Sequence, residues 1–196
     1  MAILSCSNFP AGYFNVYELA SEVENLDAVL HLGDYIYEYR NGTYAGENAE
    51  ELGRESKPNN ELISLSDYRI RYAQYRSDSS LKKLHAKVAF INVWDDHEVA
   101  DNTWSDGAKN HSEDDGLFES RKNAALQAYF EWLPIRPASP GNFEEIYRTF
   151  NFGNLVDLLM LDTRIIGRDK QLDYENYVDW NTKVLDRSRF TVDIND

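Results

Sequence analysis

The segment of residues 26–39 constrains the fold more than any other part of this sequence. Leu26-Asp27-Ala28-Val29-Leu30 is short, apolar and β-branched at its centre, which is typical of a buried strand. Gly33 ends that strand, and Asp34 and Tyr37 follow where the chain leaves the sheet. Because ligands of open α/β sheets bind outside the carboxyl ends of strands, Asp34 lies where a ligand-binding or catalytic residue is expected. On this segment alone, a helix-capping aspartate with packed tyrosines explains the pattern as well.

The rest of the chain alternates strand and helix patterns. A strand at 2–6, a loop and a helix at 13–24 precede the strand at 26–32, and this β-loop-α-β order predicts a parallel pair. The later predicted elements, assigned by the same periodicities, are a helix from residue 66, a second helix capped by Ser77-Asp78 and ending near 84, a strand at 88–93, a helix at 117–132, and strands at 146–152 and 155–161 joined by Gly153-Asn154. Residues 40–60 are polar and predict a surface insertion, and after residue 170 no element is predicted.

Composition narrows the classes of protein that the chain can belong to. The 196 residues are 42% hydrophobic and 13% aromatic, which excludes a disordered protein and predicts one domain. A formal charge of −14 argues against a surface that binds nucleic acid or anionic membranes. No apolar run reaches the ~20 residues that span a bilayer, and no signal peptide is recognisable at the start. Cys6 is the single cysteine, so an intrachain disulfide is excluded.

Polar clusters follow four of the predicted strands. They are Cys6, Asp34 with Tyr37, Asp95-Asp96-His97, and Asp162 with Arg164. One cluster is explained by a turn, but four in phase predict a single site assembled from separate loops.

The residue types in these clusters suit metal binding, proton transfer and anion binding. Asp34 can bridge two metals, Asp96 can ligate one, and a Tyr37 phenolate suits a trivalent cation. His97 can hydrogen-bond a reacting group or protonate a leaving oxygen. Two of the other members have competing interpretations. Arg164 can bind phosphate or form an ion pair with Asp162, and Cys6 can supply a thiolate or pack as a small hydrophobe. The remaining histidines are interpreted as core or surface residues: His31, His85 and His111.

Four motifs together resemble the alkaline phosphatase D (PhoD-like) family of metallophosphoesterases. In chain order they are Ser5-Cys6-Ser7-Asn8, His31-Leu32-Gly33-Asp34-Tyr35-Ile36-Tyr37-Glu38-Tyr39, Trp94-Asp95-Asp96-His97-Glu98 and Leu161-Asp162-Thr163-Arg164. The resemblance extends over nearly all of residues 3–172.

The resemblance implies a fold, a reaction and a set of metal ligands. The implied fold is an α/β, four-layer α-β-β-α sandwich, here only partly present, and the implied reaction is hydrolysis of phosphate mono- and diesters by a metal-bound hydroxide. Asp34, Tyr37 and Cys6 would hold Fe³⁺. Asp96 would bind the companion cation, Ca²⁺, and His97 would face the leaving group. The remaining implied roles are a phosphate contact by Arg164, and an open question whether Asp95 or Asn102 also serves the metal.

The sequence also departs from the family pattern. Members are much longer, and their second half supplies further ligands, whereas no histidine follows Arg164 here. We therefore expect residues 1–196 to be part of one catalytic domain, truncated at both ends and little active alone, from a periplasmic or extracellular parent. Two alternatives stay open: a non-catalytic metal- or phosphate-binding module, and a glycosidase that uses Asp95 and Asp96. Oligomeric state is not predicted.

Overall fold

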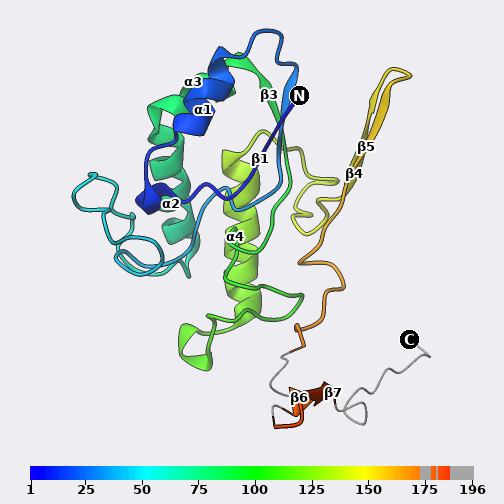
Figure 1. Cartoon of the computed structure of the whole chain (residues 1–196). Helices are drawn as coiled ribbons and strands as arrows, with labels where there is room; N and C mark the ends of the chain where they lie inside the picture. The colour runs from blue at the N-terminus through cyan, green and yellow to red at the C-terminus, as the bar shows by residue number, and fades with distance from the viewer. Residues whose placement is uncertain (173–177, 180, 186–196) are drawn as a thin grey trace.

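Three parallel strands form the sheet on which the candidate site is built. In this computed structural model, which describes residues 1–172, 178–179 and 181–185, β1 (Ala2–Leu4) and β3 (Ala89–Asn92) pair on either side of β2 (Ala28–His31) (Figure 1). All four residues of β2 are buried, as expected for a parallel strand covered on both faces. The predicted α/β class and parallel pair are confirmed.

The helices pack against one another and against the sheet. α1 (Asn15–Glu22) contacts α3 (Ser79–Lys87), and α2 (Leu65–Ser77) contacts both α3 and α4 (Phe118–Trp132). Asp78 caps α3, as predicted, because its Oδ1 accepts from the amides of Ser80 and Leu81. The largest fully buried apolar and aromatic side chains include Trp94, Tyr35, Tyr68, Tyr72, Tyr75, Tyr129, Ile36 and Leu62. No described helix has the length and apolar composition needed to cross a membrane.

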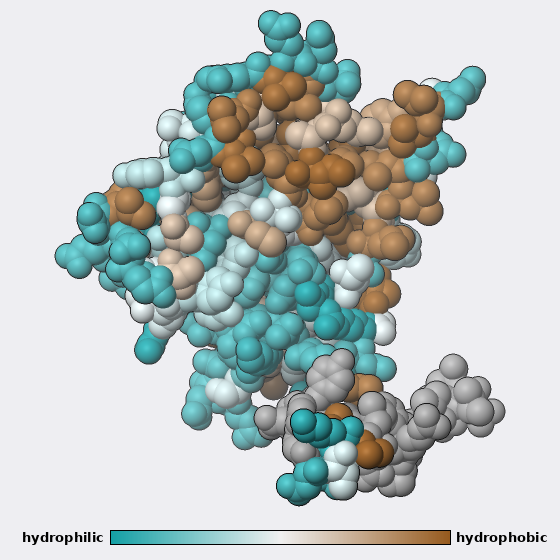
Figure 2. Space-filling view, in the orientation of Figure 1, coloured by the Kyte–Doolittle hydropathy of each residue, from teal (hydrophilic) through white to brown (hydrophobic). Residues whose placement is uncertain are grey.

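The fourth polar cluster follows a strand that lies outside the parallel sheet. β4 (Arg148–Phe152) and β5 (Val156–Met160) form a separate antiparallel hairpin, which extends along the right of Figure 1. Its turn contains Gly153 at φ +57°, in agreement with the predicted hairpin. Figure 2, in the same orientation as Figure 1, shows hydrophobic side chains gathered on the upper part of the molecule, where β1 and the hairpin lie. Leu155, in the hairpin turn, is 88% exposed.

Element boundaries differ from the prediction mainly at the strand ends. The first strand ends at Leu4 rather than Cys6, because Cys6 has φ +60° and turns the chain away from the sheet. Two short antiparallel strands, β6 (Val178–Asp179) and β7 (Val184–Leu185), lie where no element was predicted. Two-residue strands carry too few positions for a periodic pattern.

Candidate metal centre

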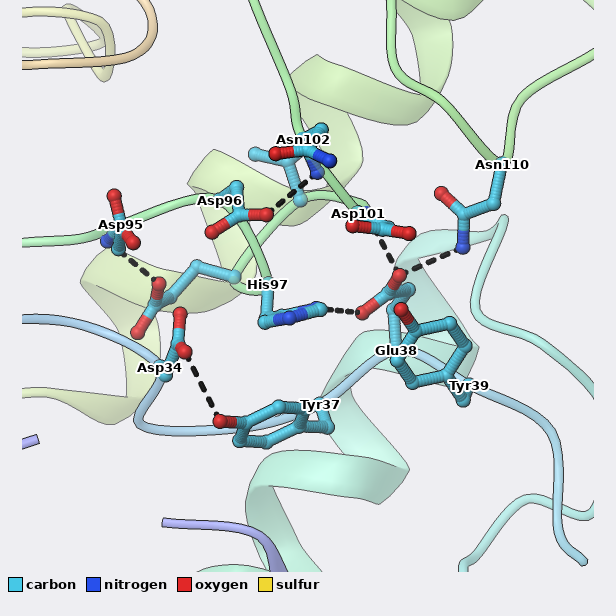
Figure 3. Close-up of polar contacts among 12 residues, drawn as sticks. Asp34, Tyr37, Glu38, Tyr39, Asp95, Asp96, His97, Asp101, Asn102 and Asn110 are labelled. Carbon is cyan, nitrogen blue, oxygen red and sulfur yellow. Dashed lines mark hydrogen bonds and ion pairs between the residues drawn. The ribbon is translucent and has the colours of Figure 1, made fainter. Parts of the chain in front are cut away.

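The carboxyl ends of the parallel strands bring polar side chains from distant segments to one edge of the sheet. Asp34 follows β2, and Asp96 and His97 follow β3. Ligand atoms of these three residues lie within 4.8 Å of one another, and all three residues are buried (Figure 3). Carboxylate and imidazole groups at such separations suit a metal ion. We call Asp34, Asp96 and His97 the metal cluster.

A glycine allows the loops that follow β2 and β3 to approach each other. Gly33 has φ +100°, and a Cβ added there would lie 2.1 Å from the amide nitrogen of Asp95 and 2.6 Å from the carbonyl carbon of Trp94. Any side chain at this position would separate the loops. The next residue, Asp34, has φ +53°, a conformation that costs a non-glycine residue about 1 kcal/mol or more. Backbone strain of this kind is typical of functional positions.

Tyr37 and Cys6 lie next to Asp34. The Tyr37 hydroxyl donates to Asp34 Oδ2 at 3.0 Å, and the thiol of Cys6, an exposed residue, lies near enough to influence the charge of both residues. The amide of Cys6 also donates to the carbonyl of Gly33 at 3.2 Å, which ties the turn after β1 to the turn after β2. Burial, and then the negative charge of Asp34, raises the pKa of Tyr37. A cation that takes Tyr37 as a phenolate must therefore displace a proton.

One carboxylate oxygen of Asp34 indicates where a cation fits. Oδ1 is buried and accepts no hydrogen bond within the part of the chain that the structure describes. Burial raises the pKa of Asp34, although the charge of His97 and the hydrogen bond from Tyr37 oppose this shift. A buried carboxylate oxygen without a partner costs free energy that a bound cation would offset. The donor set and this oxygen together fit a metal ion.

Glu38 orients His97, a role that the sequence prediction missed. Its fully buried carboxylate accepts from His97 Nδ1 at 2.8 Å, and its other oxygen accepts from the Asp101 amide and from Asn110 Nδ2, both at 2.7 Å (Figure 3). Burial lowers the pKa of His97, but the hydrogen bond and charge of Glu38, with the nearby aspartates, outweigh it and raise the value to about 9. Because Nδ1 is engaged, Nε2 is the nitrogen that faces the cluster and is left for a substrate.

Two more buried charged side chains hold the loops of the site. Glu98 accepts from the amide of Tyr35 at 2.6 Å and from the amide of Asp95 at 2.9 Å, so it joins the two loops. Burial, and then the charge of Asp34, raises the pKa of Glu98 to about 8. Arg71 on α2 donates to the backbone carbonyl of Tyr37 and to three other carbonyls. Glu38 and Glu98 both lie within the four motifs described above. An acidic residue flanked by apolar or aromatic residues was the sequence signal that could have indicated their structural role.

Arg164 reaches the metal cluster from the loop that follows β5. Its guanidinium makes a bidentate ion pair with Asp95, in which Nε lies 2.5 Å from Oδ1 and Nη2 lies 3.0 Å from Oδ2. Nη2 also lies 3.3 Å from Asp96 Oδ1. Pairing with Asp162, the competing interpretation, is wrong: Asp162 Oδ1 accepts from the backbone amides of Arg164 and Ile165 instead, each at 2.8 Å. The hydrogen bonds from Arg164 outweigh burial and lower the pKa of Asp95.

Asp96 is fixed by the strained residue Asn102. The amide of Asn102, a residue at φ +53°, donates to Asp96 Oδ2 at 2.5 Å. Burial raises the pKa of Asp96, against the charges of His97 and Arg164 and the Asn102 hydrogen bond. Whether Asp95 or Asn102 also binds the metal was left open by the sequence. In the structure the Asp95 carboxylate pairs with Arg164, and Asn102 contacts Asp96 through its backbone amide.

The other three histidines lie outside the metal cluster. His31 is fully buried, and its Nε2 lies 3.1 Å from Ser7 Oγ and 2.9 Å from the Tyr17 hydroxyl. Burial lowers the pKa of both His31 and His85 to about 3, so both rings are neutral near neutral pH. His111 Nε2 contacts the carbonyl of Gly116 at 3.1 Å. These positions agree with their interpretation as core or surface residues.

Comparison with known proteins identifies relatives over most of the chain. A family model described as "PhoD-like phosphatase" matches residues 1–192. Alkaline phosphatase D of Bacillus subtilis (strain 168) is 41% identical over 165 residues, which are 83% of this chain and 27% of that protein. A solved structure titled "Structure of PhoD" superposes with a TM-score of 0.74 at 41% identity, covering 83% of this chain and 31% of that one. The chain therefore spans about a third of its matched relatives or less, and it shares their metallophosphatase-like α/β fold.

Proposed function

Since the chain belongs to the PhoD-like phosphatase family, we propose that the protein it represents hydrolyses phosphate mono- and diesters at a metal centre formed around the metal cluster. The observation that carries this proposal is the buried convergence of Asp34, Asp96 and His97 from two strand ends. Residues 1–196 would form part of one catalytic domain. We also propose a periplasmic or extracellular location and a phosphate-ester substrate, on the support of the same family membership.

The ligands divide into two groups by their chemistry. Asp34, with Tyr37 and Cys6 at its side, offers the hard and thiolate donors proposed for Fe³⁺, and Asp96 offers a carboxylate for Ca²⁺. Asp34 Oδ1, which has no partner in the described region, would be free to bind a cation. When bound, such cations lower the pKa of water and neutralise charge on the phosphoryl oxygens.

The remaining residues would handle the phosphate and the leaving group. Arg164 uses Nε and Nη2 on Asp95, while its Nη1 makes no hydrogen bond within the described chain. That donor is proposed to bind a phosphate oxygen. Glu38 holds His97 by Nδ1, so Nε2 is proposed to give its proton to the departing oxygen.

A second candidate function follows from the small number of ligands. Calcium takes about six to eight oxygen ligands, whereas the described residues of the cluster bring two carboxylates, Asp34 and Asp96, with Tyr37 and Cys6 beside them. A non-catalytic module that binds phosphate, or a cation whose remaining ligands are water, would be compatible with this partial set. On the same grounds, the 196-residue chain alone is proposed to turn over little substrate.

Phosphatase assays separate these two functions. The chain is incubated with iron and calcium and assayed with p-nitrophenyl phosphate and bis(p-nitrophenyl) phosphate, beside Asp34→Asn. Turnover that Asp34→Asn abolishes supports hydrolysis at this site and contradicts the proposed low activity of the chain alone. Phosphate binding without turnover is what the module predicts and also what the proposed low activity of this chain predicts, so slow turnover that Asp34→Asn abolishes is the result that decides for hydrolysis. Neither binding nor turnover contradicts both functions.

A further inference from the structure

Three tyrosine rings gather around His97 of the metal cluster. Tyr37 stacks on His97 with ring centroids 4.3 Å apart, and Tyr44 lies nearly parallel to Tyr37 at 5.7 Å with an interplanar angle of 12°. Tyr44 is also 6.2 Å from His97 and 5.0 Å from Tyr39. Tyr44 comes from the polar segment 40–60, which the sequence prediction treated only as a surface insertion. Separations and angles of this kind are those of favourable aromatic pairs.

Tyr44 differs from the rings it touches in its exposure. It is 51% exposed, whereas Tyr37 is 6% and His97 is 9% exposed. The base of its loop is held by the amide of Asn41, which donates to the carbonyl of Asn59 at 2.9 Å, and Thr43 Oγ1 donates to the carbonyl of Arg40 at 2.7 Å. Tyr44 thus presents aromatic surface to solvent from a held position next to His97.

We propose that Tyr44 is a specificity residue, which stacks on an aromatic ring carried by the leaving group of a phosphate ester. This inference rests on the proposed function, in which His97 faces the leaving oxygen. A substituent on that oxygen extends away from the metal cluster past the rings nearest His97, and Tyr44 is the most exposed of them. Offset stacking favours a planar ring over an alkyl group of equal bulk, so aryl esters would be preferred to alkyl esters.

Binding of phosphonates, which contain a phosphorus–carbon bond and are not hydrolysed, tests this role without turnover. The 196-residue chain is loaded with iron and calcium, freed of unbound metal, and titrated calorimetrically with phenylphosphonate, cyclohexylphosphonate and inorganic phosphate. The variants are Tyr44→Leu and Tyr44→Phe. Tyr147→Leu is the matched control, because Tyr147 is also 51% exposed and lies at the base of the hairpin β4–β5.

Stacking predicts a selective loss. Tyr44→Leu weakens phenylphosphonate about 3- to 10-fold and leaves cyclohexylphosphonate and inorganic phosphate unchanged, while Tyr44→Phe and Tyr147→Leu bind all three like the unmodified chain. Suppose that phosphate binds the unmodified chain. The role of Tyr44 is then overturned if Tyr44→Leu binds phenylphosphonate as tightly as the unmodified chain, or if it loses affinity equally for all three probes. If the unmodified chain does not bind phosphate, the proposed function fails and this inference fails with it.

Discussion

The parallel sheet and the hairpin β4–β5 both deliver residues to the site, but they are built differently. The four residues of β2 are all buried, and the loops after β2 and β3 are joined by Glu98 and held by Arg71. In the hairpin, by contrast, exposed and half-buried positions alternate through much of both strands. Arg164 joins the site from there through its ion pair with Asp95. The sheet edge therefore sets the geometry of the metal cluster, and the hairpin adds one charge to it.

The largest difference between the two regions is expected for their glycines. Gly33→Ala should lower the free energy of unfolding by about 4 kcal/mol, because its Cβ would overlap the backbone of Asp95 and Trp94. Gly153→Ala has open space around its Cβ at φ +57°, in the left-handed region, and should cost only about 1 kcal/mol. Urea denaturation measures both, and equal costs would contradict the tight contact between the two loops.

The next contrast concerns two aspartates. Asp34→Asn removes a charged ligand whose buried Oδ1 has no partner among the described residues, so metal affinity should fall more than about 100-fold. Asp157→Asn in β5 alters an exposed carboxylate that accepts from Asn151 Nδ2 at 2.7 Å and should leave metal affinity unchanged. Metal analysis after dialysis, with circular dichroism to verify folding, measures both. Equal metal content in folded Asp34→Asn and the unmodified chain would rule out the cluster as the binding site.

Glu38→Gln sharpens the comparison within the sheet region. Replacing the carboxylate removes the charge that keeps the pKa of His97 near 9, so this pKa should fall, and metal affinity should fall about 10-fold. Nuclear magnetic resonance titration of the His97 ring gives the pKa directly. Glu145→Gln, near the hairpin, is the control, because its carboxylate pairs with Asn142. An unshifted His97 in Glu38→Gln would show that Glu38 does not govern its protonation.

The buried histidines predict how stability depends on pH. The folded pKa of His31 is about 3 and the unfolded value is about 6.5, so the unfolded chain binds one more proton between these values. This contribution is fully present above the unfolded pKa, and stability falls by about 1.4 kcal/mol per pH unit as the pH drops below it. His85 acts in the same direction. His31→Gln should reduce the slope by about that amount, and an unchanged slope of unfolding free energy against pH would contradict the buried neutral state of His31.

The smallest effect is expected on the hairpin surface. Leu155 is 88% exposed, so Leu155→Ser should change the free energy of unfolding by less than about 0.5 kcal/mol and leave metal binding unaltered. Denaturation and metal analysis of this variant provide the check. A loss of several kcal/mol would show that the hairpin is a packed part of the described fold after all.

The sequence predicts the site best where the end of a parallel strand fixes the position of a residue. Asp34, Asp96 and His97 come together because parallel strands place their carboxyl ends at one edge, a consequence of order and periodicity alone. The ion pair of Arg164 with Asp95 was not predicted, because an ion pair between residues far apart in sequence leaves no local pattern. For the same reason the contact of Glu38 with His97 was missed, although both residues stand in quoted motifs. The metal-ligand roles of these residues stay predictions.

The visible spectrum of the chain titrated with ferric iron tests the central claim most directly. If Asp34, Tyr37 and Cys6 hold Fe³⁺, displacement of the Tyr37 proton produces a tyrosinate-to-iron charge-transfer band. The account predicts that this band appears in the unmodified chain and in Tyr147→Phe, and is lost in Tyr37→Phe. A colourless chain that retains no iron after dialysis, or a band that persists in Tyr37→Phe, would contradict it.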